Sequence, residues 1–369
     1  MVNRGSNILF ILSTILVLLL SCSTFFYGEL VFKNSKMISR VTGKYLKEDS
    51  ILSPNKTATD YNLGGTDLGV IWEMEKNDYG IFFGDSYGSE FEFDTITSAP
   101  NGVDWRCNTL GFSKREDLEK GLYITDMVVD SLGNAKEIIY GKKDISGFGE
   151  WTSIPTGAIR VDNTDYVHYM NVRKWLANAN WDTNYSGLYK SIDNGQNWYK
   201  VEEGIFTEES NFAQVGYWKK GNYVYMIGTK SGRLSNPRLA RFKCNDIENR
   251  ELYEYWNSNK KKWVKGLEEQ ATDLFVDEVG ELSFIFHNIY KRWILLYFSP
   301  KRYNITVRYA KELTGEWSLP QEVAKGSDYS QLYGSYIHPL SAESTSIYYL
   351  MSMWKPYNVF LMKTEIEIQ

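Results

Sequence analysis

Asp67 and Asp85 have the residue type and the spacing of a paired-acid site. They lie at the two ends of a predicted β-hairpin, whose strands are the runs Val70–Met74 and Tyr79–Phe83, rich in β-branched and aromatic residues. Pairing outward from the polar turn between these runs sets Asp67 opposite or nearly opposite Asp85, with their Cβ atoms about 5 Å apart. Like charges that face each other across a ladder destabilise it, so the sequence indicates another role for the pair.

Two carboxyl groups this close meet the chemical requirement of glycoside hydrolysis. One carboxyl, kept protonated, assists the leaving oxygen, while the other, kept ionised, activates water or attacks directly. The structural alternative is that each aspartate caps a turn, Asp67 in GGTDLG and Asp85 in GDSYG. Spacing leaves both interpretations open. It also assigns neither the acid nor the choice between a retaining and an inverting mechanism.

Many short strands must position this pair. The chain has 369 residues, of which 15% are aromatic, and its 29 glycines are spread in short turn-like clusters. Strand-like runs recur roughly every 8 to 15 residues without a Pro-rich or Ser-rich linker. About twenty short strands without helices predict an all-β fold, a five-bladed β-propeller with four-stranded antiparallel blades, over residues 41–369. Because a propeller gathers its inner strands around one axis, distant side chains converge on a single funnel.

The segment SIDNGQNW, Ser191–Trp198, fits the S-x-D-x-G-x-x-W pattern of the Asp-box turn. Asp193 is expected to bond backbone N–H groups of the turn, Gly195 to take a positive φ, and Trp198 to pack between sheets. The motif therefore predicts a folding role in a propeller and no catalytic one.

The N-terminus predicts export. Arg4 precedes an apolar run, Ile8–Leu20, that is shorter than the about 20 residues of a membrane span, and Cys22 follows a small residue. Residues 1–22 therefore resemble a bacterial lipoprotein signal peptide with Cys22 as the lipidated residue. An ordinary secretory signal or an uncleaved anchor is the alternative. Residues 23–40 are interpreted as a tether with a candidate closing strand. We expect a lipid anchor as the only membrane contact, with the protein at the cell envelope facing the periplasm or the exterior.

Charge and missing motifs exclude several classes of function. The net charge is −5 with no basic block. The sequence therefore lacks the clustered positive charge with which proteins bind nucleic acids. The sequence has no H-E-x-x-H, no G-x-S-x-G, no phosphate-binding loop and no Cys/His cluster. We therefore expect no cofactor, while a structural cation in the funnel stays open. Cys107 and Cys244 are predicted to be buried thiols, and the protein is expected to be a monomer.

Successive motifs along nearly the whole exported chain resemble one protein family. They include GGTDLGVIWE, FFGDSYG, DWRCNTLGF, WDTNYSGLYKSIDNGQNW, LYGSYIHP and YLMSMWKPYNVFLMK, in the family's order. The family is that of the bacterial endo-α-D-arabinanases, glycoside hydrolase family 183, also known as domain-of-unknown-function family 4185. Its members are five-bladed propellers, and some act on mycobacterial arabinan. The resemblance implies that the catalytic acids, in the T-D-L-G and F-G-D motifs, fall on Asp67 and Asp85. Ser86 replaces the family's Thr and Cys107 its Ser, and neither change removes an acid.

Seven further residues in such motifs are candidates for binding the substrate, and each has a structural alternative. They are Arg106, Asn108, Arg233, Tyr333, His338, Trp354 and Tyr357. The polar side chains either bond sugar hydroxyls or anchor the inner blades, and the aromatic ones either stack on a sugar or pack between strands.

The sequence thus predicts a polysaccharide hydrolase that cleaves internal α-D-arabinofuranosyl or similar furanoside bonds with Asp67 and Asp85. The rival hypothesis is a surface-tethered carbohydrate-binding or adhesion protein on the same scaffold, without turnover.

Overall fold

The computed structural model describes residues 28–44, 50–94, 99–177 and 180–369. Within these ranges the regular structure is mainly β-strand, and the paired strands run antiparallel, from β1 with β23 to β8 with β9. Strands form where the sequence offers short β-branched and aromatic runs. The run RWILLYFS of β18, for example, is buried along its whole length. The predicted all-β fold is confirmed.

The strands form five sheets of four or five strands and a separate two-stranded hairpin. The first sheet contains β2 (Leu68–Glu73), β3 (Asp78–Phe83), β6 (Thr109–Lys114) and β7 (Asp126–Met127). The second contains β8 (Thr152–Val161), β9 (Thr164–Leu176), β10 (Asn180–Ser191) and β11 (Tyr199–Thr207). The third contains β12 (Gln214–Lys220), β13 (Tyr223–Thr229), β14 (Arg238–Lys243), β15 (Glu254–Asn257) and β16 (Lys262–Lys265).

The fourth sheet contains β17 (Leu282–His287), β18 (Arg292–Ser299), β19 (Asn304–Ala310) and β20 (Gln321–Lys325). The fifth contains β21 (Leu332–Ile337), β22 (Ser346–Met353), β23 (Asn358–Ile368) and β1 (Leu30–Arg40). The hairpin is β4 (Glu92–Asp94) with β5 (Ala99–Asn101). The helical segments are short: α2 (Thr57–Asp60), η1 (Leu118–Lys120), η3 (Cys244–Asp246), η4 (Arg250–Leu252), η5 (Glu268–Gln270) and η6 (Pro339–Glu343).

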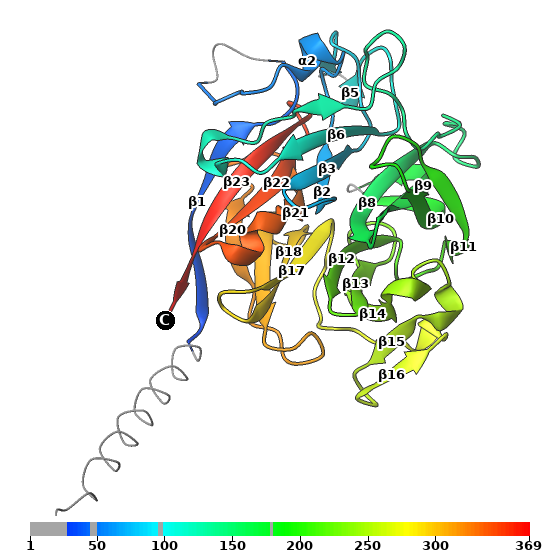
Figure 1. The fold of residues 1–369 in the computed structure, drawn as a ribbon, viewed down its shortest axis with the longest axis vertical. Coiled ribbons are helices and arrows are strands. Elements are labelled where there is room, and N and C mark those ends of the chain that lie inside the picture. The colour runs from blue at the N-terminus through cyan, green and yellow to red at the C-terminus, as the bar shows by residue number, and fades with distance from the viewer. Residues whose placement is uncertain (1–27, 45–49, 95–98, 178–179) are drawn as a thin grey trace, which may run out of the picture.

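Five strands, one from each large sheet, pack side by side. Each of them contacts the corresponding strands of two other sheets. β2 lies beside β8 and β21, β12 lies beside β8 and β17, and β17 lies beside β21. Figure 1 shows these five strands around the middle of the molecule, with β1, β11 and β16 at the periphery. Side chains from the ends of these inner strands can therefore meet although they are far apart in sequence. The number of blades stays a prediction.

The two ends of the described chain share one sheet. β1 pairs with β23 from Leu30 opposite Ile368 to Arg40 opposite Phe360, so the most N-terminal strand lies outside the most C-terminal one. Because this pairing joins the first and last segments of the fold, it holds the fifth sheet next to the first.

The Asp-box turn has the predicted geometry. Asp193 Oδ1 accepts the backbone N–H of Asn197 at 2.9 Å, and Gly195 has a φ of 82°. The Trp198 ring packs edge-on against Phe82 of the first sheet, with ring centroids 5.1 Å apart. All three expectations for this motif are confirmed, and its role is to join two sheets.

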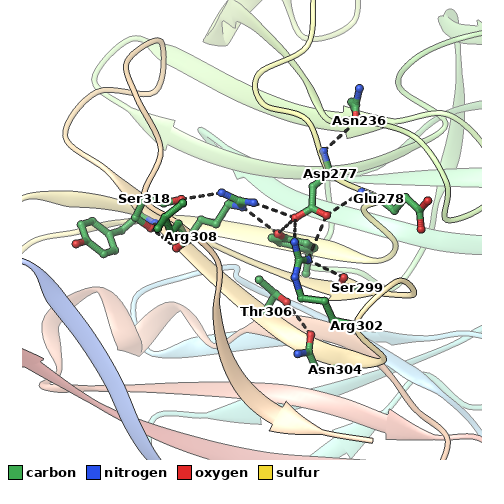
Figure 2. Close-up of polar contacts among 12 residues, drawn as sticks. Asn236, Asp277, Glu278, Ser299, Arg302, Asn304, Thr306, Arg308 and Ser318 are labelled. Carbon is green, nitrogen blue, oxygen red and sulfur yellow. Dashed lines mark hydrogen bonds and ion pairs between the residues drawn. The ribbon is translucent and has the colours of Figure 1, made fainter.

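A buried carboxylate network holds the segment that leads into β17. Asp277 accepts hydrogen bonds from Tyr297, Arg302 and Arg308 at 2.6–3.1 Å, and Figure 2 shows both arginines converging on it. Burial alone would raise the pKa of Asp277, but the bonds from Arg302, Tyr297 and Arg308 outweigh burial and lower it below its ordinary value. This network holds the chain just ahead of Glu281, a residue of the candidate site.

Candidate active site

The predicted hairpin is present, and it brings Asp67 and Asp85 onto facing chains. β2 and β3 pair antiparallel through the residues between the two acids. Past the end of this ladder the chains meet again where Gly65 forms a bridge with Tyr87. Asp67 and Asp85 therefore lie between two paired stretches.

The ladder is irregular beside Asp67. The register shifts between Leu68 and Val70, and Leu68 and Gly69 both have left-handed φ values, of 68° and 89°. A left-handed φ is strained at a leucine and persists only where its surroundings hold it. Here the Leu68 N–H donates to Ser352 Oγ of β22 at 2.8 Å. Such a bulge re-aims a side chain, and Asp67 lines the central cavity.

Gly84 makes room for the Asp67 carboxyl group. Its N–H donates to the Asp67 carbonyl oxygen at 3.1 Å, and a Cβ atom added at Gly84 would lie 2.3 Å from Asp67 Oδ1. An approach this close is a severe overlap in a close-packed interior. Gly84 of the F-G-D motif therefore leaves the space that the Asp67 carboxyl group occupies.

Asp67 and Asp85 line the same cavity, of about 920 Å³. This volume is in the range of small-molecule and substrate pockets, and the lining comes from all five large sheets. The aromatic members are Tyr87, Trp105, Trp151, Trp175, Trp181, Phe298, Tyr303, Tyr333, Tyr336, Trp354 and Tyr357. The charged members are Asp67, Asp85, Arg233 and Glu281.

The Asp67 carboxyl group is in an environment that keeps it protonated. Tyr333 Oη donates to Asp67 Oδ2 at 2.8 Å, while the buried Oδ1 has no hydrogen-bond partner among the described residues. Burial raises the pKa of Asp67 to about 8; the hydroxyl groups of Tyr333 and Tyr357 oppose the rise, and the charges of Asp85 and Glu281 add to it. At neutral pH this carboxyl can donate a proton.

The surroundings of the Asp85 carboxyl group favour its ionised form more than those of Asp67 do. Trp105 Nε1 donates to Asp85 Oδ1 at 2.8 Å, and Thr152 Oγ1 donates to the same oxygen at 2.6 Å. Burial raises the pKa of Asp85 to about 6, against the hydrogen bonds from Thr152 and Trp105, which lower it. Asp85 is therefore mostly ionised at pH 7, and Oδ2 accepts neither of these bonds.

Glu281 is a third carboxylate in the cavity, and Arg233 holds it. Arg233 donates to Glu281 Oε1 through Nε at 3.0 Å and through Nη2 at 2.5 Å. The guanidinium carbon also lies 5.1–5.3 Å from the ring centroids of Trp181, Phe298 and Tyr333. Arg233 is thus paired with a carboxylate, and the lining carries no second cation among the described residues.

Four of the seven candidate binding residues belong to the cavity lining. They are Arg233, Tyr333, Trp354 and Tyr357. The aromatic ones form a cluster, in which the Trp354 ring packs edge-on against Tyr357 and Tyr333 with centroids 5.5 and 6.2 Å apart.

The other three candidates have structural roles outside the cavity lining. Arg106 donates to two loop carbonyl groups at 2.9 and 3.0 Å, and Asn108 donates to the carbonyl groups of Ile139 at 2.8 Å and of Ser153 in β8 at 2.9 Å. His338 is fully buried, accepts the Leu340 N–H at 3.2 Å and packs against Tyr79. Arg106, Asn108 and His338 are not among the residues that line the cavity, so a role for them in substrate binding stays a prediction.

Several residues of the site were not singled out from the sequence. Trp105 and Thr152 hold Asp85, and Glu281 holds Arg233. Trp105 directly precedes Arg106 in the DWRCN motif, so its place in that motif could have identified it as a site residue. Thr152 and Glu281 carry no comparable local signal, since only the meeting of different sheets brings them to the acids.

Cys22 lies outside the described residues. Cys107 and Cys244 are buried free thiols, as predicted. Within the described ranges, no group of three or more His, Cys, Asp and Glu side chains is arranged to hold a metal ion. Within the same ranges, no helix has the length and apolar character that crossing a membrane requires.

Sequence comparison matches one family, described as Domain of unknown function (DUF4185), to residues 52–363. Among curated proteins, the chain is 25% identical over 323 residues to Notoamide biosynthesis cluster protein J of Aspergillus sp. (strain MF297-2), which covers 83% of this chain and 84% of that protein. It is 25% identical over 309 residues to Notoamide biosynthesis cluster protein J' of Aspergillus versicolor, with coverage of 80% and 82%. Both relatives are fungal, so bacterial origin and membership of glycoside hydrolase family 183 stay predictions.

Structure comparison finds a similar fold in solved structures that include a glycoside hydrolase. A crystal structure from Bacteroides ovatus ATCC 8483 matches with a TM-score of 0.58 and 12% identity, over 84% of this chain and 87% of that one. The exo-beta-1,3-galactanase of Phanerochaete chrysosporium, solved with beta-1,3-galactotriose, matches with a TM-score of 0.52 and 10% identity, over 91% of this chain and 67% of that one. Identities this low show a shared propeller-like fold alone.

Proposed function

This chain belongs to the DUF4185 family, and from that premise we propose that it is a glycoside hydrolase in which Asp67 and Asp85 cleave a furanoside bond. The observation that carries the proposal is one cavity with two buried carboxyl groups whose pKa values differ, about 8 for Asp67 and about 6 for Asp85. Carboxyl pairs with separated pKa values supply the acid and the base of glycosidases. The fold shared with a galactanase supports this class of reaction.

Asp67 is the general acid in this proposal. Its proton passes to the glycosidic oxygen as the bond from that oxygen to the anomeric carbon breaks, and Oδ1 is the oxygen that Tyr333 leaves without a partner. Asp85 is the ionised partner, which stabilises the positive charge that develops at the anomeric carbon. Through Oδ2 it either removes a proton from the attacking water or attacks that carbon itself. The anomeric configuration of the first product, read by proton NMR, separates these two routes.

The proposed substrate is a polysaccharide with internal α-D-arabinofuranosyl or closely similar furanoside bonds. The family resemblance implies the sugar. The aromatic lining supports a glycan, because sugar rings bind in apolar and aromatic clefts with a few placed polar groups. The Arg233–Glu281 ion pair supports an uncharged glycan, because it leaves no net positive charge to meet a uronate or a phosphate.

We also propose that the five large sheets are the blades of one closed five-bladed ring. The mutual packing of β2, β8, β12, β17 and β21 supports this arrangement, and so does the pairing of β1 with β23 in the fifth sheet. In such a ring the last blade would be completed by the first strand of the fold, which closes the circle.

Export with a lipid anchor at Cys22 is part of the same proposal. Its basis is the signal-like segment of residues 1–22. Fractionation of cells that make the wild type or Cys22→Ser tests it. Membrane-bound wild type and released variant are expected, and equal partition of both proteins would contradict lipidation.

The deciding experiment measures release of oligosaccharides from arabinan and other furanoside polymers. Asp67→Asn and Asp85→Asn are each expected to lower the rate by about 10²–10⁴-fold. Asp162→Asn is a matched control, because the Asp162 side chain is 73% exposed. Wild-type rates in both site variants would refute the assignment of the acids. Glycan binding without release by the wild type would instead establish the non-catalytic carbohydrate-binding protein.

A further inference from the structure

One wall of the cavity is built from apolar side chains of the second sheet and of the loop before it. We call it the apolar wall, and its members are Ile145, Ile154, Met170, Trp175, Leu176 and Trp181. Asp67 and Tyr333 supply polar groups from other sheets, and the Arg233–Glu281 pair borders the wall, because the Arg233 guanidinium carbon lies 5.2 Å from the Trp181 ring centroid.

The members of the apolar wall are contiguous. Ile154 of β8 is the ladder partner of Met170 of β9, and Trp175 of β9 is the ladder partner of Trp181 of β10. The two indole rings pack edge-on with centroids 5.7 Å apart. These four side chains therefore form one continuous surface across three strands.

This wall offers little to a sugar hydroxyl. The indole Nε1 of Trp181 donates to Met170 Sδ at 3.1 Å and so already has an acceptor. A hydroxyl group placed against Ile154 or Met170 would lose its water partners without gaining new ones, which disfavours a fully hydroxylated ring there. Flat indoles alone would suit a sugar face, but the branched and flexible aliphatic members match a chain of methylene groups.

The apolar wall begins beside the acid pair and ends in solvent. Thr152, which donates to Asp85, is two residues before Ile154 on β8, so both side chains point to the same face of the strand. Ile154 is 6% exposed, whereas Leu176 is 40% and Ile145 is 65% exposed. A ligand with its sugar at the carboxyl groups would therefore lay its next group along the wall toward the rim.

We propose that the substrate carries an alkyl or acyl chain next to the sugar at the carboxyl groups, and that the apolar wall binds this chain. The proposal rests on the proposed function for the position of the sugar. Two sources supply the same chemistry. The chain is either the aglycone of a glycoside or an acyl ester on a sugar hydroxyl.

Calorimetric titration of the Asp67→Asn chain, which prevents turnover, tests the proposal. One arm uses n-alkyl α-D-arabinofuranosides from methyl to octyl, below their micelle concentrations. The other uses methyl arabinofuranosides esterified with acyl chains of the same lengths. Affinity is expected to rise about fourfold with each methylene group that the wall covers, with an increasingly negative heat capacity of binding. The arm in which this happens identifies the source. Equal affinities of the shortest and longest ligands in both arms would overturn the proposal.

A rim variant ties the effect to the apolar wall. The double change Ile145→Ser and Leu176→Ser alters two exposed side chains and leaves the core intact. It is expected to weaken binding of the octyl ligand tenfold or more and to leave binding of the methyl ligand unchanged. Leu319→Ser is the control, because Leu319 is 83% exposed and is not part of the cavity lining. An equal loss in this control would overturn the proposal, since it would indicate non-specific adsorption.

The inference and the proposed function fail in different ways. If the wild type binds the ligands with an affinity that depends on chain length but cleaves no furanoside, the role of the apolar wall is supported and the proposed hydrolase activity is refuted. Hydrolysis of furanosides with no dependence of affinity on chain length would keep the hydrolase and refute the wall.

Discussion

Tyr333 donates its hydroxyl group to Asp67 Oδ2 at 2.8 Å, although the two residues are 266 positions apart in sequence. The bond joins the fifth sheet to the start of the first, and it leaves the second oxygen of Asp67 without a partner among the described residues. The protonation state of Asp67 therefore depends on the packing of one sheet against another.

Activity is expected to follow a bell-shaped pH profile with its maximum between about pH 6 and pH 8. Below this range Asp85 becomes protonated and stops acting as the base, because its pKa is raised to about 6. Above it Asp67 loses the proton that it must donate, because its pKa is raised to about 8. The profile of kcat/KM reports both groups in the free enzyme, as the apparent values of an interacting pair. A profile that stays flat from about pH 5 to pH 9 would contradict the acid assignment.

Tyr333→Phe is expected to move the alkaline limb of this profile to higher pH. The Tyr333 hydrogen bond favours ionised Asp67 and lowers its pKa against the effect of burial. Removing the hydroxyl therefore raises the pKa of Asp67 further and keeps its proton to higher pH. The matched control is Tyr199→Phe, since Tyr199 is 57% exposed and lies outside the cavity lining. A limb that moves to lower pH, or the same movement in both variants, would contradict this role.

Gly84→Ala is expected to lower activity by about 100-fold, because the new Cβ would overlap Asp67 Oδ1 and displace the acid from its position. Overpacking should also lower the free energy of unfolding by about 1–3 kcal/mol. Gly204→Ala is the control for crowding away from the acid, because an added Cβ there would lie 3.3 Å from Leu188 and Val201, tighter than an ordinary contact. Rate measurements together with urea unfolding separate the two effects. Wild-type activity in Gly84→Ala would show that Asp67 can act from another position.

Asp67→Asn is expected to stabilise the fold at alkaline pH. Burial raises the pKa of Asp67 from its ordinary value of 3.8 to about 8, so between these values the native state binds more protons than the unfolded chain. Stability then falls as pH rises through this window. Asn carries no charge, so the variant escapes this loss. Melting temperatures at pH 5 and pH 9 test the prediction. The gain of the variant over wild type should be larger at pH 9, and an equal gain at both values would count against a buried, protonated Asp67.

Asp277→Ala is expected to destabilise the fold by about 3–5 kcal/mol, because it leaves the buried Arg308 without its carboxylate. Burial alone would raise the pKa of Asp277, but hydrogen bonds from Arg302, Tyr297 and Arg308 lower it below its ordinary value. Its contribution is therefore present above the ordinary carboxyl pKa and lost as pH falls through the lowered value. Glu367→Gln removes an exposed ion pair and should cost less than about 1 kcal/mol. Urea unfolding at neutral and acidic pH measures both, and equal losses in the two variants would contradict the network of Figure 2.

What the sequence predicted correctly depends on local signals. The hairpin between Asp67 and Asp85 follows from two short strands and a polar turn, and the Asp-box turn follows from residues within Ser191–Trp198. The all-β fold follows from the repetition of such runs. In each case the residues that determine the geometry are neighbours in the chain, so their types and spacing are sufficient.

The tertiary structure alone decided which polar residues belong to the cavity. Arg106 and Arg233 are both arginines in motif segments, but Arg106 donates to loop carbonyl groups while Arg233 holds Glu281 at the cavity. The pKa values of Asp67 and Asp85 are raised by burial between the sheets, and hydrogen bonds from other strands, Tyr333 for one and Thr152 for the other, lower them in part. The physical reason is that burial and hydrogen bonding depend on which sheets meet, and the meeting of sheets is not encoded in the spacing of any single segment.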